Sequence, residues 1–240
     1  MYAGLRSTDP DLLSMTWEDL LFAHWPVDPD RVEARLPEGL TVATYDGDAY
    51  LGVVPFVMQS IGPRWAPVGL SFGELNLRTY VRETGPDAAS ADGEHGVYFF
   101  ALDADDRLGV TIARSLFRLP YYRATMTVDR AGDRVAFRSR RPDGSATFAA
   151  AYGPDGDRSV PEAGSLAAFL TENYRFYTAD DRGRLWYGDI DHPPWELAPA
   201  RVDIVTNELF AVNGFEHPAG EPVCHYSPRI RVTAGRPHRA

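Results

Sequence analysis

Turn residues recur at short intervals along this chain, and they separate segments rich in Val, Phe, Tyr and Thr. Asp46-Gly47, Gly132-Asp133 and Asp143-Gly144 each lie between two such segments. Tight turns between runs of β-branched and aromatic residues are typical of β-hairpins. We therefore predict a mainly antiparallel sheet, with hairpins formed by residues 40–45 with 49–59 and by residues 124–129 with 134–140, and a strand at 147–152 that joins the second hairpin.

Helical patterns are few in the sequence. Asp28 followed by Pro29 provides an N-cap and a first-turn proline, so a helix is predicted to begin there and to end before Pro37. Ser165 provides a similar cap for a second short helix. Residues 108–117 suit a helix or a strand. The pattern indicates a mainly β fold in which a closed or strongly curled sheet carries a few peripheral helices.

Length and composition are those of an ordinary folded chain. The 240 residues, 44% of them hydrophobic, are enough for a sizeable core. An all-β chain of this size is commonly one domain, so we expect a single domain over residues 1–240 with a frayed tail after about residue 232. The sequence contains no apolar stretch of the ~20 residues that a membrane span needs and no signal-peptide pattern. We therefore expect a cytoplasmic protein without a membrane partner.

The charge balance and the absence of lysine exclude two classes of function. The sequence holds 24 Lys plus Arg against 34 Asp plus Glu, a net charge of −10 at pH 7. This acidic balance argues against a nucleic-acid partner. All 24 basic residues are Arg. A chain without Lys cannot form a lysine Schiff base with a carbonyl substrate, so that mechanism is excluded.

Cysteine and histidine give no sign of a metal or a cofactor. Cys224 is the single cysteine, so an intramolecular disulfide or a thiolate cluster is impossible. Its neighbour His225 is expected on the opposite face of a strand, which favours an inert cysteine. The six histidines show none of the spacings that bind zinc, so we expect no metal and no cofactor. His24 suits a buried core histidine or a ligand-binding one equally.

One segment, residues 72–82, separates polar from apolar side chains with the period of a strand. Its apolar face holds Leu75, Leu77, Thr79 and Val81, and its polar face holds Glu74, Asn76, Arg78 and Tyr80. A carboxylate, an amide, a guanidinium and a phenol in register are typical of the inside of a small-molecule pocket. Arg78 offers a planar fork for a carboxylate or phosphate group, and Asn76 can orient the same ligand. Glu74 can act as acid or base, and Tyr80 as proton donor. The alternative is a half-exposed strand whose polar face meets water.

Aromatic and basic residues gather again after residue 95. The aromatic side chains of residues 96–103 are expected mainly in the core. Tyr121 and Tyr122 follow Pro120 at the junction of two elements, where side chains can point over the mouth of a pocket. Together with Arg118, these two tyrosines are further candidates for ligand binding.

Short blocks spread over residues 20–200 carry a resemblance to a known family. They are Trp25-Pro26-Val27, Leu36-Pro37-Glu38-Gly39-Leu40, Asp46-Gly47, Asn76-Leu77-Arg78-Thr79-Tyr80-Val81, Gly96-Val97-Tyr98-Phe99-Phe100, Leu119-Pro120-Tyr121-Tyr122 and His192-Pro193-Pro194-Trp195. On these blocks the chain resembles the YqjF-like family of uncharacterised proteins. The resemblance implies a fold similar to that of acetoacetate decarboxylase, a distant relative, in which antiparallel strands wrap around a cone-shaped barrel with a pocket inside. That enzyme works through a lysine Schiff base assisted by pocket Arg and Glu residues, so its chemistry does not carry over to a chain without Lys.

Three hypotheses for function follow from these observations. The first is a β-barrel pocket that binds a small carboxylic acid through Arg78, with lysine-independent acid–base chemistry at a carbonyl if the protein is an enzyme. In that chemistry Glu74 acts as base and Tyr80 or Tyr121 as donor. The others are a non-catalytic binding module and a structural or interaction protein. A raised pKa of Glu74 in an enclosed apolar site favours catalysis, a tight Glu74–Arg78 pair favours a binding or structural role, and Arg78 in bulk water favours a structural role. The sequence leaves the oligomeric state open.

Overall fold

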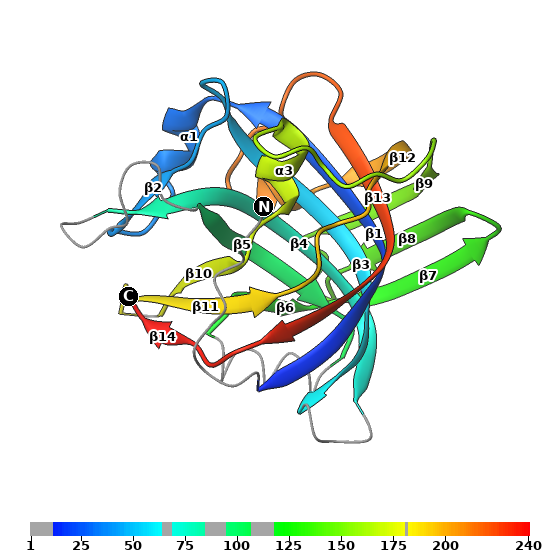
Figure 1. Cartoon of the computed structure of the whole chain (residues 1–240), viewed down its shortest axis with the longest axis horizontal. Helices are drawn as coiled ribbons and strands as arrows, with labels where there is room; N and C mark the ends of the chain where they lie inside the picture. The colour runs from blue at the N-terminus through cyan, green and yellow to red at the C-terminus, as the bar shows by residue number, and fades with distance from the viewer. Residues whose placement is uncertain (1–11, 64–68, 85–94, 107–117, 181) are drawn as a thin grey trace.

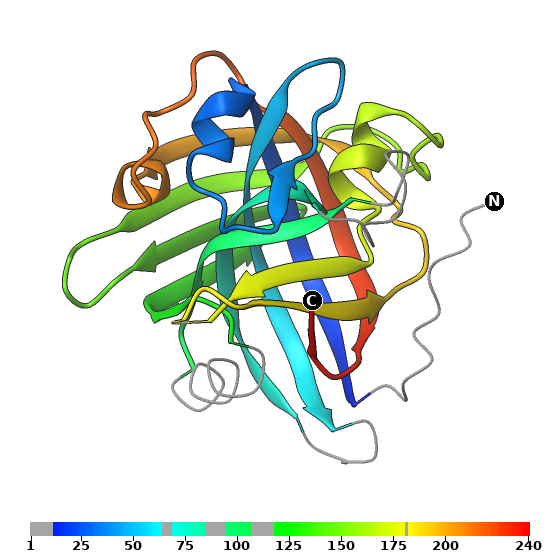
Figure 2. The ribbon, with the colours of Figure 1, turned by 90° about the vertical axis from the view of Figure 1, so that its left-hand side faces the viewer.

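The computed structural model describes residues 12–63, 69–84, 95–106, 118–180 and 182–240. The strands are β1 (Leu13–Val27), β2 (Leu40–Val42), β3 (Ala49–Pro63), β4 (Leu70–Glu83), β5 (Gly96–Ala104), β6 (Tyr121–Arg123), β7 (Thr125–Ala131), β8 (Arg134–Arg140), β9 (Thr147–Pro154), β10 (Arg175–Ala179), β11 (Leu185–Asp191), β12 (Ala198–Asn207), β13 (Val223–Ala234) and β14 (His238–Arg239). The helices are α1 (Pro29–Glu33), α3 (Leu166–Thr171) and α4 (Leu209–Val212). The expected mainly β architecture with few helices is confirmed, and the helices lie at the periphery of the sheet (Figures 1 and 2).

Seven strands close into a ring. They run in the order β13, β1, β3, β4, β5, β10 and β11, and a short antiparallel pairing of β11 with β13 closes the circle. This seam joins Ile190 to Ala234 and Asp191 to Thr233. The pairings are antiparallel except those of β5 with β10 and with β6. The predicted curled antiparallel sheet is therefore confirmed, and it encloses an interior.

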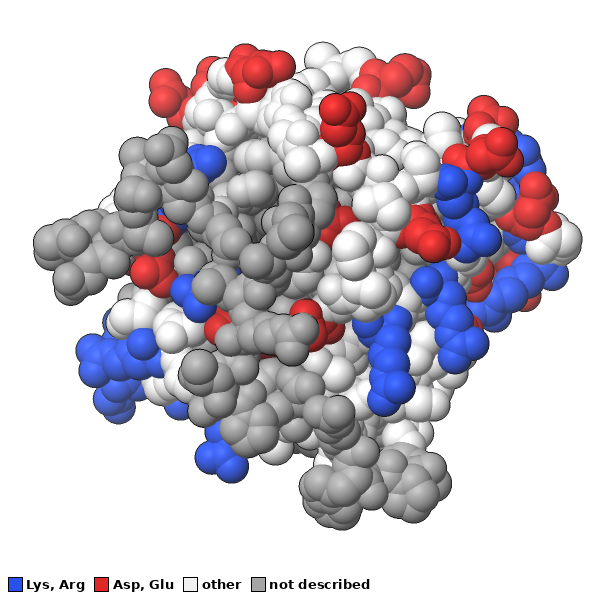
Figure 3. Space-filling model, viewed as in Figure 1, with Lys and Arg blue, Asp and Glu red and all other residues white. Residues whose placement is uncertain are grey.

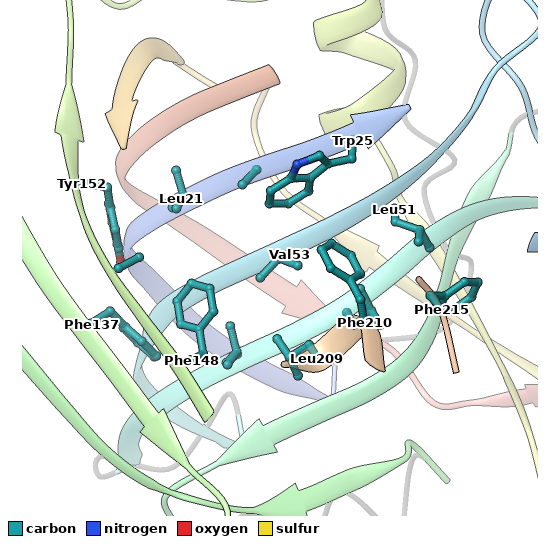
Figure 4. Packing of buried hydrophobic residues seen from close by; sticks show 14 of the residues in the cluster. Leu21, Trp25, Leu51, Val53, Phe137, Phe148, Tyr152, Leu209, Phe210 and Phe215 are labelled. Carbon is teal, nitrogen blue, oxygen red and sulfur yellow. The ribbon is translucent and has the colours of Figure 1, made fainter. Parts of the chain in front are cut away.

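A second part of the sheet continues outward from β13 through β12, β9 and β8 to β7 (Figure 1). The predicted hairpin of residues 124–129 with 134–140 is β7 with β8, and β9 joins it as expected. This extension folds back over the outside of the ring strands. Its inner face and α4 bury an apolar cluster against β1, β3 and β4 (Figure 4).

The predicted pairing of residues 40–45 with residues 49–59 is wrong. The turn at Asp46-Gly47 forms, since both residues have a positive φ and Tyr45 exchanges two backbone hydrogen bonds with Asp48. The strand before the turn leaves β3, however, and pairs with β4 instead. Both sides of β3 are already taken by the longer strands β1 and β4. The segment 40–42 gains burial elsewhere, because Leu40 packs beside Val81.

The two capped helices form as predicted. Asp28 Oδ1 accepts from the backbone N–H of Asp30 at 3.0 Å, and α1 ends at Glu33, well before Pro37. Residues 108–117 lie outside the described residues. The expected fraying after residue 232 is wrong, because β13 continues to Ala234 and β14 pairs with β11.

The cap of α3 provides a local test of this assignment. Ser165 Oγ accepts from the backbone N–H of Ala168 at 3.2 Å. Ser165→Ala leaves that N–H without its partner and is expected to lower the free energy of unfolding by about 1 kcal/mol. Urea denaturation measures this change. Because Ser159 is exposed and caps no helix, Ser159→Ala is the matched control, and an equal loss in both variants would contradict the role of the cap.

The strands of the ring divide their side chains between two faces with a period of two. On β1, Leu21, Ala23 and Trp25 pack outward into the cluster under the second part of the sheet. Leu20 and Phe22 belong instead to the cluster inside the ring. On β4, the apolar face with Leu75 and Leu77 packs outward. The polar face of β4 therefore points into the ring.

The surface charges are mixed on one side of the molecule. On the right of the face seen in Figure 3, Arg side chains lie among Asp and Glu side chains, whereas the upper edge shows mainly Asp and Glu and the lower left mainly Arg. On the strands of the extension, Arg201 pairs with Asp133 at 2.6 Å and Arg134 with Asp203 at 3.8 Å. Within the described residues, no helix is long and apolar enough to cross a membrane.

Candidate functional site

The interior of the ring holds a cavity of about 620 Å³. Its walls come from β1, β3, β4 and β5 and, on the other side, from β10, β11 and the segments around them. Most of the lining is aromatic or aliphatic, and its largest apolar side chains are Met15, Trp17, Phe22, Phe56, Met58, Phe72, Phe99, Phe176 and Trp195. A cavity of this size with mainly apolar walls is typical of a small-molecule site.

Three of the predicted polar residues of β4 line this cavity. Glu74 and Asn76 are 3% exposed, and Arg78 is 8% exposed. The alternative of a half-exposed strand with its polar face in water is therefore wrong. The closed ring buries the polar face of β4, because β3 and β5 flank this strand and the opposite wall covers that face.

Glu74 is held by two neighbours inside the cavity. Tyr121 Oη donates to Glu74 Oε2 at 2.7 Å, and the side chain of Asn76 also forms a hydrogen bond with Glu74. Burial outweighs these hydrogen bonds and raises the pKa of Glu74 from 4.5 to about 7. A carboxyl group with this pKa can give up or take a proton near neutral pH. Burial and the Glu74 charge raise the pKa of Tyr121 well above 10, so the phenol keeps its proton.

Arg78 is a buried cation without a carboxylate partner among the described residues. Its Nη2 donates to the Leu170 carbonyl at 3.3 Å, while its Nε has no partner in the described part of the chain. The guanidinium carbon lies 5.3 Å from the centre of the Phe22 ring and 5.8 Å from that of Tyr80. Aromatic faces stabilise a cation only in part, so the site is suited to an anion.

Tyr80 and His24 lie behind Arg78 and do not line the cavity. Tyr80 Oη donates to the Leu170 carbonyl at 2.6 Å and lies 2.6 Å from His24 Nε2. Because the single hydroxyl hydrogen goes to the carbonyl, His24 Nε2 carries the hydrogen of the second bond. Burial and Arg78 lower the pKa of His24 well below 6.5, so the ring is neutral. The two side chains support Leu170, and Tyr121 is the phenol that meets Glu74 in the cavity.

A close approach explains the glycine opposite His24. A Cβ added at Gly52 would lie 2.7 Å from the His24 ring. The strand β3 therefore needs a glycine where it passes His24, and this packing fixes the ring that supports Tyr80.

Arg118 and Tyr122, which were predicted to bind ligand, lie outside the cavity lining. Tyr122 is 39% exposed, and the Arg141 guanidinium lies 3.8 Å from the centre of its ring. Arg118 is exposed and lies over Trp186. The alternation of side chains along β6 explains the position of Tyr122, because it turns Tyr121 inward and its neighbour Tyr122 outward.

Sequence reasoning missed the polar residues on the opposite wall, which are Thr171, Asn173, Arg175 and His192. Arg175 is paired with Asp189 at 2.7 Å, so its charge is already balanced. Burial lowers the pKa of His192, which stacks on Tyr174 with ring centres 4.5 Å apart. His192 lies in the block 192–195 that carried part of the family resemblance, and this block was the available signal.

The remaining His, Cys, Asp and Glu side chains in the described part of the chain form no metal or nucleophile site. Within the described residues, no cluster of three or more His, Cys, Asp or Glu side chains is placed to hold a metal ion. Cys224 lies on β13, and burial raises the pKa of its thiol to about 12. Its thiolate is therefore scarce at neutral pH.

The chain is similar to proteins of known sequence and structure over most of its length. The profile of the DUF2071 family, described as an uncharacterized conserved protein, matches residues 14–231. The uncharacterized protein YqjF of Bacillus subtilis is 40% identical over 225 residues, which cover 92% of this chain and 89% of that protein. This confirms the predicted YqjF-like relationship.

Solved structures with a similar fold are enzymes. The crystal structure of acetoacetate decarboxylase from Legionella pneumophila has a TM-score of 0.63 at 14% identity, covering 100% of this chain and 92% of that one. The enduracididine biosynthesis enzyme MppR, solved in complex with pyruvate, has a TM-score of 0.65 at 15% identity over 98% of this chain and 91% of its own. An acetoacetate decarboxylase-like enzyme from Sphingomonas wittichii has a TM-score of 0.61 at 18% identity, covering 100% and 97%. At these identities the likeness is one of fold, as the resemblance to acetoacetate decarboxylase implied.

Proposed function

Since the chain belongs to the DUF2071 family of uncharacterized conserved proteins and shares the fold of acetoacetate decarboxylase, we propose that it binds an organic acid and acts on it by acid–base chemistry. The acid places its carboxylate on Arg78. Glu74 then moves a proton at a carbon next to a carbonyl group. This chemistry needs no lysine, which the chain lacks.

The observation that carries the proposal is the state of Arg78. An unpaired cation buried among apolar side chains is costly, and proteins keep such groups where a partner arrives. The only carboxylate of β4 that shares the cavity with Arg78, Glu74, is bound by Tyr121 and Asn76 instead. A ligand carboxylate would supply the missing charge and would accept from the guanidinium fork. MppR, a neighbour in fold, was solved in complex with a small keto acid, and this supports the choice of ligand class.

The environment of Glu74 favours turnover over binding alone. Its raised pKa and its separation from Arg78 match the catalytic alternative rather than a structural Glu74–Arg78 pair. The Glu74 carboxylate takes the proton from the carbon, and the charge moves to the carbonyl oxygen of the ligand. Tyr121 can then turn its hydroxyl from the protonated Glu74 toward that oxygen. The purely structural hypothesis required Arg78 in bulk water and does not fit its burial.

Arg78→Met is expected to weaken acid binding strongly while leaving the empty protein at least as stable as the parent. The methionine fills a similar volume without a charge, and the Leu170 carbonyl keeps the hydrogen bond from Tyr80. A thermal-shift screen with small carboxylic, keto and hydroxy acids measures both effects. An acid at about 100 times its Kd should stabilise the parent by roughly 2.7 kcal/mol, and the variant should bind it at least about tenfold more weakly.

Arg118→Met is the matched control for that screen, because it removes one positive charge outside the cavity lining. It should bind acids as the parent does. Equal binding by the parent and Arg78→Met would contradict the proposed anchor. Parent protein that no acid stabilises would contradict the proposed function as a whole.

A further inference from the structure

We propose that the acid taken by this cavity is an elongated apolar one, a carboxylic acid with a medium-length alkyl or aryl-alkyl chain. The inference rests on the proposed function, because it uses Arg78 as the carboxylate anchor. It adds the part of the ligand that lies beyond the reacting carbon. The supporting observations are the length of the cavity and the order of its lining residues along the strands.

Every second residue of β4 lines the cavity from Arg78 to Leu70, in the order Arg78, Asn76, Glu74, Phe72 and Leu70. At about 3.3 Å per residue, the Cα atoms at the two ends of this row are roughly 26 Å apart. The polar residues occupy one half of the row and the apolar residues the other. A ligand that is held by Arg78 and passes Glu74 therefore meets only hydrocarbon side chains farther along β4.

The neighbouring strand β3 lines the cavity with apolar side chains only. Phe56 pairs with Glu74, Met58 with Phe72 and Ile61 with Leu70, and all three of these β3 residues line the cavity. On β1, Trp17 lies opposite Met58 and also lines it. The end of the cavity remote from Arg78 is thus apolar on three adjacent strands.

The Arg78 end is polar on the opposite wall as well. The Leu170 carbonyl accepts from Arg78, and the next residues along the chain that line the cavity are Thr171 and Asn173. Asn173 is buried, and its Oδ1 has no partner within the described residues. The end of the cavity near Arg78 can therefore hold a charged group, while the apolar end near Leu70 excludes one.

A short keto acid would satisfy Arg78 but leave the apolar end empty. The volume of about 620 Å³ lies within the range of sites that enclose drug-sized ligands. Each methylene group moved from water into this end should tighten binding about fourfold, the equivalent of ~0.8 kcal/mol. The geometry thus selects for chain length as well as for the carboxylate.

Titration calorimetry of the full chain with butyrate, hexanoate, octanoate and decanoate tests the proposal. We expect the Kd to fall about fourfold per methylene until the cavity is filled. Decanol, which has the chain without the carboxylate, should bind at least about tenfold more weakly than decanoate. Arg78→Met should weaken all four acids by a similar factor.

A second variant blocks the apolar end without touching Arg78. Ile61 lies near the end of β3 and is half-buried, so Ile61→Trp can be accommodated. It should weaken decanoate at least tenfold and leave butyrate unchanged. Leu70→Trp, which narrows the cavity from β4, repeats the test if the first variant does not fold. Val205→Trp on the exposed face of β12 is the matched control, since Val205 is 74% exposed.

The outcomes separate this inference from the proposed function. Affinity that depends on Arg78 but stays flat with chain length overturns the inference and leaves the proposed function standing. Decanol that binds as tightly as decanoate, or binding of none of the acids, overturns both. If neither tryptophan variant affects decanoate binding, the alkyl chain of decanoate does not lie in the apolar end of the cavity, and the inference is overturned.

Discussion

Glu74→Gln is expected to raise the free energy of unfolding by about 3 kcal/mol at pH 8 and to change it little at pH 4. The pKa of Glu74 rises from 4.5 to about 7 on folding because burial disfavours the carboxylate. At about 1.4 kcal/mol per pKa unit, this rise corresponds to roughly 3 kcal/mol of stability. Glutamine has a similar shape and carries no charge at any pH, so it removes the pH dependence.

The sign of this effect follows from where the protons are bound. Below pH 4.5 Glu74 is protonated in both the folded and the unfolded chain, and its contribution to stability is fully present. Between pH 4.5 and about 7 the folded protein retains a proton that the unfolded chain has lost, so stability falls as pH rises. Above about pH 7 the contribution of Glu74 to stability is fully lost.

Urea denaturation of the parent and the variant at pH 4, 6 and 8 measures the difference. Glu38→Gln is the matched control, since Glu38 is exposed and its substitution should give no comparable trend. A constant difference between parent and Glu74→Gln at all three pH values would contradict the raised pKa.

Glu74→Gln should also slow proton transfer on a bound acid by a factor of about 10² to 10⁴, the usual contribution of a general base. The measurement is the exchange of the protons next to the ketone of 2-oxobutyrate and 2-oxooctanoate in D2O, followed by proton NMR. In the parent the rate should rise with pH through about 7, because only the Glu74 carboxylate can take the proton.

Tyr121→Phe separates the roles of the two residues in this reaction. The phenylalanine removes the hydrogen bond to Glu74 Oε2 but keeps the ring, so exchange should slow while Glu74 remains the base. Exchange that is as fast in Glu74→Gln as in the parent would show that another group takes the proton. A binding module without catalysis would show no exchange above that in buffer.

The strand carrying the site was predictable because its pattern is local. Glu74, Asn76 and Arg78 alternate with Leu75 and Leu77, and a strand places such residues on opposite faces. Whether the polar face points to water or to a cavity is not a local property. The answer depends on the pairing of β11 with β13 and on the wall that they hold opposite β4.

The errors have the same origin in contacts between distant segments. Tyr80 shares the polar face with Arg78, yet α3 packs over that end of β4 and places Leu170 against the Tyr80 hydroxyl. Asn173 and His192 belong to segments about 100 residues away from β4. No short motif marks Asn173, and the block 192–195 carried the family resemblance without indicating that His192 lines the cavity. The turn at Asp46-Gly47 was read correctly, but a turn does not specify which strand the preceding segment will join.

The ring also sets an order for the biosynthesis of the protein. β1 and β13 pair at eleven residue positions, from Leu13 with Ala234 to His24 with Val223, and roughly two hundred residues separate them along the chain. A ribosome releases β1 long before β13, so a nascent chain exposes one edge of β1 until the β13 segment has been made. The closed cavity thus comes into being only after β13 has left the ribosome, and no shorter nascent chain can hold the proposed acid in the enclosed site.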